Sequence, residues 1–537
     1  MDIQGKNCVL LLVGWMAIML AGCQTAQTTE SDSVRDSEIA AEGEIENSKE
    51  ADRDNKLAEE ALLGDKENKI ADDMELNDGD DDSGGQEEEV ILFRSYPSET
   101  DGLLSVAVSA EDKFYVDLSM YPELQELTRK DRKEYEQFFR GLQSGGEEDI
   151  SVNEYIKRAD TCVYSVLCIG CTEEVIEYTG FNYHVESGRA LSLEDVVKDK
   201  GALIDALAEQ LYGSLSSVNP KDLAVELCKA DNHAWNIGYQ GLTFYVDTSL
   251  PEGGTTQYIP VMIIFAEYPS LFYEEYMQVP EKYAVAEDAF SAFMYDLNED
   301  GTAEEINILG EESNGDLEQL TIRIGDLEKT IKTESELVDE DLMLKYLRCH
   351  ILHLGDGKNL IYLHTRYALD GLYYGIILER SDSEIKVLNT EAGLSIQGGL
   401  LIDPQYIVCT GGDRLLGSIW DFFVGRCWQV DDGGQLQKEE ETEYYLPGNF
   451  QIETTAELAA DEIDQDNESV IASQILLQTG TILTPLRTDN ATFVDFINEY
   501  GQVYRVAFEV QYDSDYGRVG MINGGLASDV MKVAVGR

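Results

Sequence analysis

The residues best suited to chemistry lie in the stretch YDLNEDGTAEEINI, at residues 295–308. Counted from Asp296, the odd positions one to nine all carry side-chain oxygens: Asp296, Asn298, Asp300, Thr302 and Glu304. In tight calcium loops these positions point inward, and a glycine at position six, here Gly301, makes the sharp turn. The spacing therefore indicates a calcium loop in which Thr302 contributes its main-chain carbonyl oxygen.

Two interpretations of this loop stay open. Position twelve is Asn307 rather than the bidentate Glu of an EF-hand, so the spacing excludes an EF-hand. The flanking AFSAFMY and INIL favour strands, and the loop resembles the Asp-x-Asn-x-Asp-Gly calcium loops of propeller-type repeats. Such a site would bind calcium with a Kd on the order of 10⁻⁴–10⁻³ M. The alternative is a hydrated turn, since Asn, Asp and Gly are the ordinary turn residues.

Other residues with reactive side chains fit structural roles. Cys168 and Cys171 have CxxC spacing, but VYSVLCIGCTEEVIEY alternates like a strand, which places the two thiols on opposite faces. The same argument separates His350 from His353. The sequence has no GxSxG, P-loop or GxGxxG motif, which favours a binding protein over an enzyme. Paired carboxylates for glycoside hydrolysis stay open as an alternative.

The first 22 residues predict a signal peptide. Residues 9–22 form an uncharged, mostly apolar run of 14, preceded by Lys6. This run is shorter than the roughly 20 apolar residues of a membrane-spanning helix, and it suits the apolar part of a secretory signal. It ends in a sequence that resembles the lipobox of bacterial lipoproteins: Leu20, Ala21, Gly22 and Cys23. The resemblance implies cleavage before Cys23 and lipid on its sulfur, which would anchor the protein to the outer face of the cell membrane.

Residues 23–90 predict a disordered acidic tether. From residue 24 to residue 90 there are 24 acidic and 6 basic side chains and no aromatic one, for a formal charge of −18. Such a segment cannot bury enough apolar surface to offset the entropy lost on ordering. We expect an extended spacer between the membrane and the folded part.

The charge of the remaining residues, 91–537, restricts the class of partner. They hold 80 acidic and 32 basic side chains, for a formal charge of −48. Nucleic-acid binding depends on Lys and Arg contacts to phosphate, so this balance argues against nucleic acid. It favours calcium or a basic protein attracted over long range.

The pattern of elements predicts an α+β domain over residues 91–285 and a mainly-β domain over residues 286–537. In the first, amphipathic helices are expected at 131–146 and from Ser192 onward, between alternating strands. In the second, short alternating stretches flank three hairpin signals, at residues 370–371, 432–433 and 500–501. This spacing is typical of a sandwich, a barrel or a propeller-like set of sheets.

Three segments of the first domain carry a family resemblance: FNYHVESGRALSLEDVVKD, WNIGYQGLTFYVD and IPVMIIFAEYPSLF. In this order they resemble the extracellular domain of RsiV-type anti-sigma factors, which also occurs in some peptidoglycan deacetylases and Gram-positive lipoproteins. The resemblance covers about 195 of the 537 residues. Because RsiV-type members bind lysozyme, it implies a very basic partner. We expect neither a cytoplasmic sigma-binding segment nor deacetylase metal ligands, so neither activity is carried over.

Together these features predict a surface-anchored, non-catalytic binding or sensor lipoprotein of a Gram-positive cell envelope. Its partners would be the membrane, through the lipid, and a basic protein such as lysozyme or a cell-wall component. The alternative function is a cell-envelope hydrolase, or an accessory subunit of one, that acts on peptidoglycan or glycans.

Overall fold

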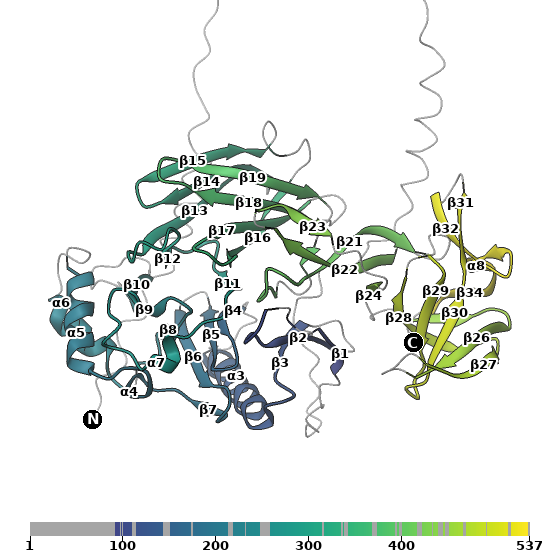
Figure 1. The fold of residues 1–537 in the computed structure, drawn as a ribbon, viewed down its shortest axis with the longest axis horizontal. Helices are drawn as coiled ribbons and strands as arrows, with labels where there is room; N and C mark the ends of the chain where they lie inside the picture. The colour runs from purple at the N-terminus through teal and green to yellow at the C-terminus, as the bar shows by residue number, and fades with distance from the viewer. Residues whose placement is uncertain are drawn as a thin grey trace, which may run out of the picture. The chain divides into compact units, whose positions relative to one another are not determined.

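The protein is mainly β, with few helices and several antiparallel sheets (Figure 1). The computed structural model describes residues 92–534 with these gaps: 97, 99, 110–113, 143–150, 173–174, 213–218, 231, 248–257, 314–315, 334–336, 338–341, 368–372, 393–394, 397–399, 416–421, 432, 439–443, 446–450, 465–468, 490 and 514–516. The predicted signal peptide and tether lie outside the described residues. None of the described helices has the length and apolar character that crossing a membrane requires.

The first described elements form two small sheets and a long helix. A three-stranded sheet has the order β1-β2-β3: β1 (Leu92–Tyr96), β2 (Ser105–Ser109) and β3 (Phe114–Asp117). A four-stranded sheet follows in chain order: β4 (Ser151–Ala159), β5 (Val163–Cys171), β6 (Ile176–His184) and β7 (Arg189–Ala190). The strand structure predicted around the CxxC is confirmed, in β5 and the start of β6.

Helix α3 (Pro122–Leu142) begins nine residues before the predicted start at Asp131. Pro122 is its first residue, a position where the missing N–H of proline breaks no helical hydrogen bond. Tyr135 and Phe139 lie one turn apart and pack on the Val166 and Cys168 side of β5.

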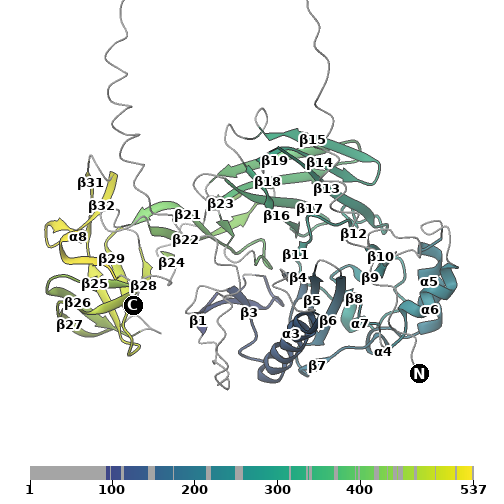
Figure 2. The same ribbon diagram turned by 180° about the vertical axis from the view of Figure 1, so that it is seen from behind.

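A second group of helices packs on the three-stranded sheet β8-β9-β10, and α5 and α6 lie side by side in both views (Figure 2). The strands are β8 (Trp235–Ile237), β9 (Gly241–Asp247) and β10 (Tyr258–Ile264). The helices are α4 (Leu193–Val196), α5 (Lys200–Gln210), α6 (Pro220–Leu227) and α7 (Glu274–Met277).

The single helix predicted from Ser192 is wrong, because the structure divides it into α4 and α5. Ser192 does begin α4, and its N–H and Oγ both donate to Asp195 Oδ2. The break follows because Lys198 N–H donates to the Leu271 carbonyl, which draws this segment into a tertiary contact. Asp199 then starts α5 by accepting a hydrogen bond from the Ala202 N–H at 3.0 Å.

The sheet that carries the acidic loop has nine strands. Its main path is β12 (Phe293–Tyr295), β13 (Glu304–Ser313), β14 (Asp316–Ile324), β16 (Leu342–His353), β17 (Asn359–Tyr367), β18 (Tyr373–Arg380) and β19 (Ile385–Ala392). Two further strands pair at its sides: β11 (Tyr283–Glu287) with β16, and β15 (Leu327–Lys332) with β14. The predicted domain boundary, between residues 285 and 286, falls inside β11. The strand pairing predicted around residues 370–371 is confirmed by β17 and β18.

The C-terminal strands form a twelve-stranded and a three-stranded sheet. The larger contains β20 (Ser395–Ile396), β21 (Ile407–Leu415), β22 (Phe422–Val430), β23 (Leu436–Lys438), β24 (Tyr444–Tyr445), β25 (Ile452–Thr454), β26 (Leu458–Ile463), β27 (Val470–Leu477), β28 (Ile482–Thr488), β29 (Phe493–Ile497), β30 (Val503–Ala507) and β34 (Met531–Val533). The smaller contains β31 (Glu509–Asp513), β32 (Gly517–Ile522) and β33 (Gly525–Leu526), followed by α8 (Ala527–Val530). The other two predicted hairpins are confirmed by the pairs β22–β23 and β29–β30.

Candidate functional site

Of the five residues predicted to bind calcium, Asp296, Asn298, Asp300 and Thr302 lie in the loop between β12 and β13, and Glu304 is the first residue of β13. These two strands pair antiparallel, with Tyr295 opposite Glu304, so the prediction of an inter-strand loop is confirmed. Gly301 has a φ of 88°, a value that glycine adopts readily and that the turn requires. The four residues predicted to form the lipobox, Leu20 to Cys23, lie outside the described residues.

Asp296 is the buried anchor of the loop. The residue is 4% exposed, and its carboxylate accepts hydrogen bonds from the N–H groups of Asp300 at 3.1 Å and Gly301 at 2.9 Å. Burial raises the pKa of Asp296, and the charge of Asp300 adds to that rise, while the backbone hydrogen bonds oppose it. The Asp296 carboxylate therefore holds the turn closed from within.

Hydrogen bonds between residues of the loop also stabilise the side that faces solvent. Asn298 Nδ2 donates to Asp300 Oδ2 at 2.9 Å, and the Thr302 N–H donates to Asp300 Oδ1 at 2.9 Å. These two bonds lower the pKa of Asp300, because they stabilise its charged form. At the other end, Glu304 Oε2 accepts from the Leu297 N–H at 3.0 Å.

Glu304 also joins the loop to the rest of the nine-stranded sheet. Its Oε1 lies 3.0 Å from Arg380 Nη2, and both side chains are largely buried, at 12% and 16% exposed. Burial nevertheless raises the pKa of Glu304. Glu304 thus serves as an ion-pair partner as well as a loop-closing acceptor.

The donor set suits calcium chemically, because it consists of carboxylate and amide oxygens. In the geometry described, the Asp296, Asp300 and Glu304 carboxylates accept hydrogen bonds from the loop's own N–H groups. Across the described ranges, no three or more His, Cys, Asp or Glu side chains gather in a way that could hold a metal ion. Calcium binding by this loop stays a prediction.

Gln240 connects the loop to a neighbouring pocket. Its side-chain amide makes two hydrogen bonds with the backbone of Asp296: Oε1 accepts from the N–H at 3.0 Å, and Nε2 donates to the carbonyl oxygen at 2.9 Å. Gln240 also lines the pocket, together with Met294 and Tyr295 of β12. A change in the conformation of the loop would therefore reach the pocket wall directly.

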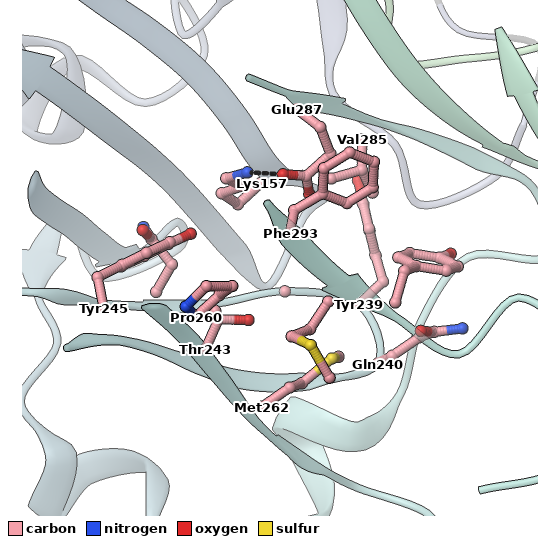
Figure 3. Close-up of a pocket in the computed structure, with 14 residues that line it drawn as sticks. Lys157, Tyr239, Gln240, Thr243, Tyr245, Pro260, Met262, Val285, Glu287 and Phe293 are labelled. Carbon is pink, nitrogen blue, oxygen red and sulfur yellow. Dashed lines mark hydrogen bonds and ion pairs between the residues drawn. The ribbon is translucent and has the colours of Figure 1, made fainter. Parts of the chain in front are cut away.

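One wall of the pocket is a face of the sheet β8-β9-β10. Along β9, Leu242, Phe244 and Val246 point into the core that α5 and α6 cover. Thr243 and Tyr245 alternate with them and line the pocket, and their register partners on β10, Met262 and Pro260, lie beside them. Figure 3 shows Thr243, Pro260 and Met262 on one side of the pocket and Lys157 and Glu287 on the other. The space inside it that is open to the centres of water-sized groups is about 30 Å³.

The opposite wall carries a buried ion pair. Lys157 Nζ on β4 donates to Glu287 Oε2 on β11 at 2.5 Å and to the Ala286 carbonyl oxygen at 3.1 Å. The two charged side chains are 6% and 9% exposed. Burial raises the pKa of Glu287, and the Lys157 charge opposes that rise. The two charges cancel, so this wall is formally neutral.

Arg158, the residue after Lys157 on β4, forms a second buried hydrogen-bond network. Arg158 is 0% exposed, and its Nε donates to Asp160 Oδ2 at 2.6 Å. Its Nη1 donates to the Tyr276 carbonyl oxygen at 2.7 Å, and its Nη2 donates to the Gln278 carbonyl oxygen at 2.9 Å. The Arg158 charge is thus compensated inside the fold, and Arg158 fixes the backbone at the C-terminal end of α7.

Asn236 on β8 completes the polar lining of the pocket. It is 1% exposed, and its Nδ2 donates to Ser165 Oγ at 2.9 Å and to the Val166 carbonyl oxygen at 3.1 Å. Its Oδ1 accepts no hydrogen bond from any residue in the described part of the chain. The Oδ1 atom is itself buried, so it is an unsatisfied acceptor inside the fold.

The cysteine and histidine pairs considered above lie on strands, as their alternating neighbours predict. Cys168 and Cys171 both lie on β5, and Cys168 is the buried one of the two. His350 and His353 both lie on β16, where His350 is buried and His353 is half-buried. His353 Nδ1 lies 2.9 Å from Asn359 Oδ1 and 3.3 Å from Glu299 Oε1 of the acidic loop.

The pocket residues were not predicted from the sequence. Lys157, Asn236 and Glu287 lie on three strands that are far apart in the chain. A weak signal existed, because Asn236 lies between the apolar residues Trp235 and Ile237. A polar residue at a buried strand position is informative, since it requires a hydrogen-bond partner.

In comparisons with protein-family models, curated proteins and solved structures, nothing matches this chain. The resemblance to the extracellular domain of RsiV-type anti-sigma factors therefore stays a prediction.

Proposed function

We propose that the protein is an extracytoplasmic, lipid-anchored binding or sensor lipoprotein of a Gram-positive cell envelope. It acts without catalysis, and its ligand is a basic protein such as lysozyme or a component of the cell wall. The anchor is supported by residues 20–23, Leu-Ala-Gly-Cys, directly after the apolar run. The formal charge of −66 for the whole chain supports a basic protein partner, because opposite charge speeds encounter.

The pocket between the β8-β9-β10 sheet and the Lys157–Glu287 pair is the observation that carries the binding role. It combines apolar side chains with a few fixed polar groups, the usual composition of a ligand site. Of the described residues that line it, none is a histidine, cysteine or serine. Its charged groups are held by each other rather than positioned as a separate acid and base.

The proposal also includes a division of the chain into four segments. The chain would consist of a signal peptide (1–22), an acidic tether (23–90), an RsiV-like α+β domain (91–285) and a β-rich domain of sandwich, barrel or propeller type (286–537). The positions of α3 to α7, all before residue 278, support an α+β first domain. Calcium in the loop of Asp296 would be a structural ion next to the pocket wall.

A paired binding and turnover assay tests the proposal. Purified protein is mixed with lysozyme or with muropeptides, and the bound fraction and the masses of the muropeptides are measured. Cytochrome c, another basic protein, controls for attraction by charge alone. We expect specific retention of lysozyme or of wall fragments, with muropeptide masses unchanged. Turnover of a muropeptide would instead support the hydrolase alternative, and no retention of any of these ligands would contradict the binding role.

A further inference from the structure

Strand β27 forms an outer edge of the twelve-stranded sheet and exposes apolar side chains there (Figure 1). Among the described strands it pairs only with β26. Val470, Ile471 and Leu476 are 54%, 62% and 55% exposed. Single exposed apolar residues are ordinary on a protein surface, but these three form an apolar stripe up to about 20 Å long on one strand. A stripe of this kind is typical of a surface that a partner covers.

The edge strands of the nine-stranded sheet are protected in a way that β27 is not. In the described part of the chain, β15 pairs only with β14 and carries Lys329 and Lys332. In the same range β19 pairs only with β18, and it carries Lys386. Lysine on an edge strand opposes contact with other chains. The sequence of β27, VIASQILL, contains no charged residue, so β27 lacks this protection.

Irregular pairing turns neighbouring side chains of β27 outward. Val470 lies opposite Ile463. The next pair is Ala472 with Glu462, so Ile471 is an additional residue without a register partner on β26. Such a bulge breaks the alternation of the strand, and both Val470 and Ile471 are exposed. A second irregularity follows further along β27. Bulges disfavour the addition of a regular strand, so a partner would contact side chains rather than extend the hydrogen-bond ladder.

Charge decides which partner suits the apolar stripe. From residue 457 to residue 477, which includes β26 and β27, the sequence has six acidic side chains and no basic one. Two of these acids are placed beside β27: Asp461 Oδ1 accepts from the Gln474 N–H at 2.8 Å, and Glu462 lies opposite Ala472. A second copy of the chain would bring the same negative charge, and an anionic lipid surface would also repel this edge. A cationic protein would be attracted to it.

We propose that the edge formed by β26 and β27 binds a cationic amphipathic segment of a partner protein. The apolar side chains of that segment cover Ile471 and Leu476, and its lysine or arginine side chains face Asp461 and Glu462. The inference rests on the proposed function, which includes a basic protein as ligand, and it adds the surface that this protein contacts. Both properties of the segment are required, because charge alone would leave the apolar stripe in water.

Binding of three model peptides to the intact protein tests the proposal. The first peptide has leucine and lysine at helical spacing, because the bulges disfavour an added strand. In the second, glutamate replaces lysine, and in the third, serine replaces leucine. Fluorescence anisotropy of the labelled peptides gives the affinities. We expect the first peptide to bind more weakly as salt is raised, and the other two to bind at least about tenfold more weakly than the first.

Two double variants locate the binding. Ile471→Thr/Leu476→Thr removes most of the apolar stripe and keeps β-branched residues on the strand. The matched control is Leu309→Thr/Val387→Thr, at positions of β13 and β19 that are 44% and 37% exposed. We expect the first variant to bind the leucine–lysine peptide about tenfold more weakly than the wild type, and the control to bind it equally well.

No binding of the leucine–lysine peptide, or equal binding by the wild type and the β27 variant, would overturn the inference. Equal binding of the lysine–serine peptide would also overturn it, since charge alone would then suffice. Sedimentation of the wild type as a dimer that the β27 variant loses would show that a second copy covers the edge. Flotation of the wild type with anionic vesicles, lost in the β27 variant, would assign the edge to a lipid surface instead.

Retention of lysozyme by the wild type and by the β27 variant is measured separately. Equal retention of lysozyme by both would contradict the inference and leave the proposed function in place. No retention of lysozyme or wall fragments by the wild type would contradict the proposed function, while the peptides still test the edge. The two can therefore fail independently.

Discussion

Replacing Lys157 with methionine would leave the Glu287 carboxylate buried without its cation. In the native protein Lys157 Nζ lies 2.5 Å from Glu287 Oε2, and the two side chains are 6% and 9% exposed. Methionine is unbranched and flexible and nearly fills the space of the lysine stem, so the change removes charge with little loss of packing. The effect on stability should therefore come mainly from the unpaired carboxylate.

The expected loss is about 3–5 kcal/mol of unfolding free energy, since removing one partner of a buried ion pair leaves the other charge uncompensated. The matched control is Lys130→Met on α3. Lys130 lies 3.7 Å from Glu134, but both side chains are 63% exposed, so the pair is screened by water. We expect the control to change the unfolding free energy by about 0.5 kcal/mol or less.

The loss should depend on pH in a defined direction. Burial raises the pKa of Glu287 above its ordinary value, and removing Lys157 removes the charge that opposes this rise. An acid whose pKa is raised in the folded state holds its proton there while the unfolded chain is already ionised. Stability is therefore lost as pH rises from the unfolded pKa, about 4.3, through the folded pKa. The deficit of Lys157→Met should be largest near pH 7 and should shrink toward pH 4.

Urea unfolding followed by tryptophan fluorescence measures these differences, because the buried Trp235 is next to Asn236 in the pocket wall. The double variant Lys157→Met/Glu287→Leu removes both charges, and we expect it to recover most of the stability at pH 7. The reasoning would be refuted if Lys157→Met lay within about 1 kcal/mol of the wild type at pH 7. It would also be refuted if the double variant were as unstable as the single one.

Three further predictions concern other parts of the chain. Calorimetry should detect calcium binding to the wild type with a Kd on the order of 10⁻⁴–10⁻³ M. The double variant Asp296→Ala/Asp300→Ala should show no calcium binding. No heat in the wild type, or equal heat in the variant, contradicts the calcium interpretation. Cys23→Ala should leave the signal peptide uncleaved and the protein without lipid, as mass spectrometry of the membrane fraction would show; normal processing argues against a lipoprotein. Gly241→Ala should lower the unfolding free energy by about 1–3 kcal/mol in urea, because its Cβ would lie 2.2 Å from the Ile263 carbonyl oxygen; an unchanged midpoint would be inconsistent with this close approach.

Local signals in the sequence predicted the local structure well. The glycine of the Tyr500-Gly501 pair has a φ of 77°, as a tight hairpin requires, and β29 and β30 pair across it. Ser192 and Asp195 form the capping interaction that their spacing indicates. The loop between β12 and β13 follows from Asp, Asn and Gly between two apolar flanks. In each case the residues that determine the structure are close together in the chain.

Tertiary contacts account for what the sequence pattern could not predict. Strict alternation on β4 would place only one of Lys157 and Arg158 inside, yet both are buried. The register of β4 against β5 shifts between Ile156 and Arg158, so Lys157 occupies the irregular position and both side chains turn inward. A pattern of period two cannot reveal such a bulge. The division of the predicted helix after Val196 has a similar origin, in the contact between Lys198 and Leu271.

Photo-crosslinking on intact cells tests the central claim most directly. A photoreactive amino acid replaces Thr243 at the mouth of the pocket, and the same replacement at Thr321 is the control. We predict adducts at position 243, and not at position 321, that carry a cell-wall fragment or a basic protein from outside the membrane. No adduct at position 243 above the level of the control, or an adduct with a cytoplasmic protein, would contradict an extracytoplasmic binding role for this pocket.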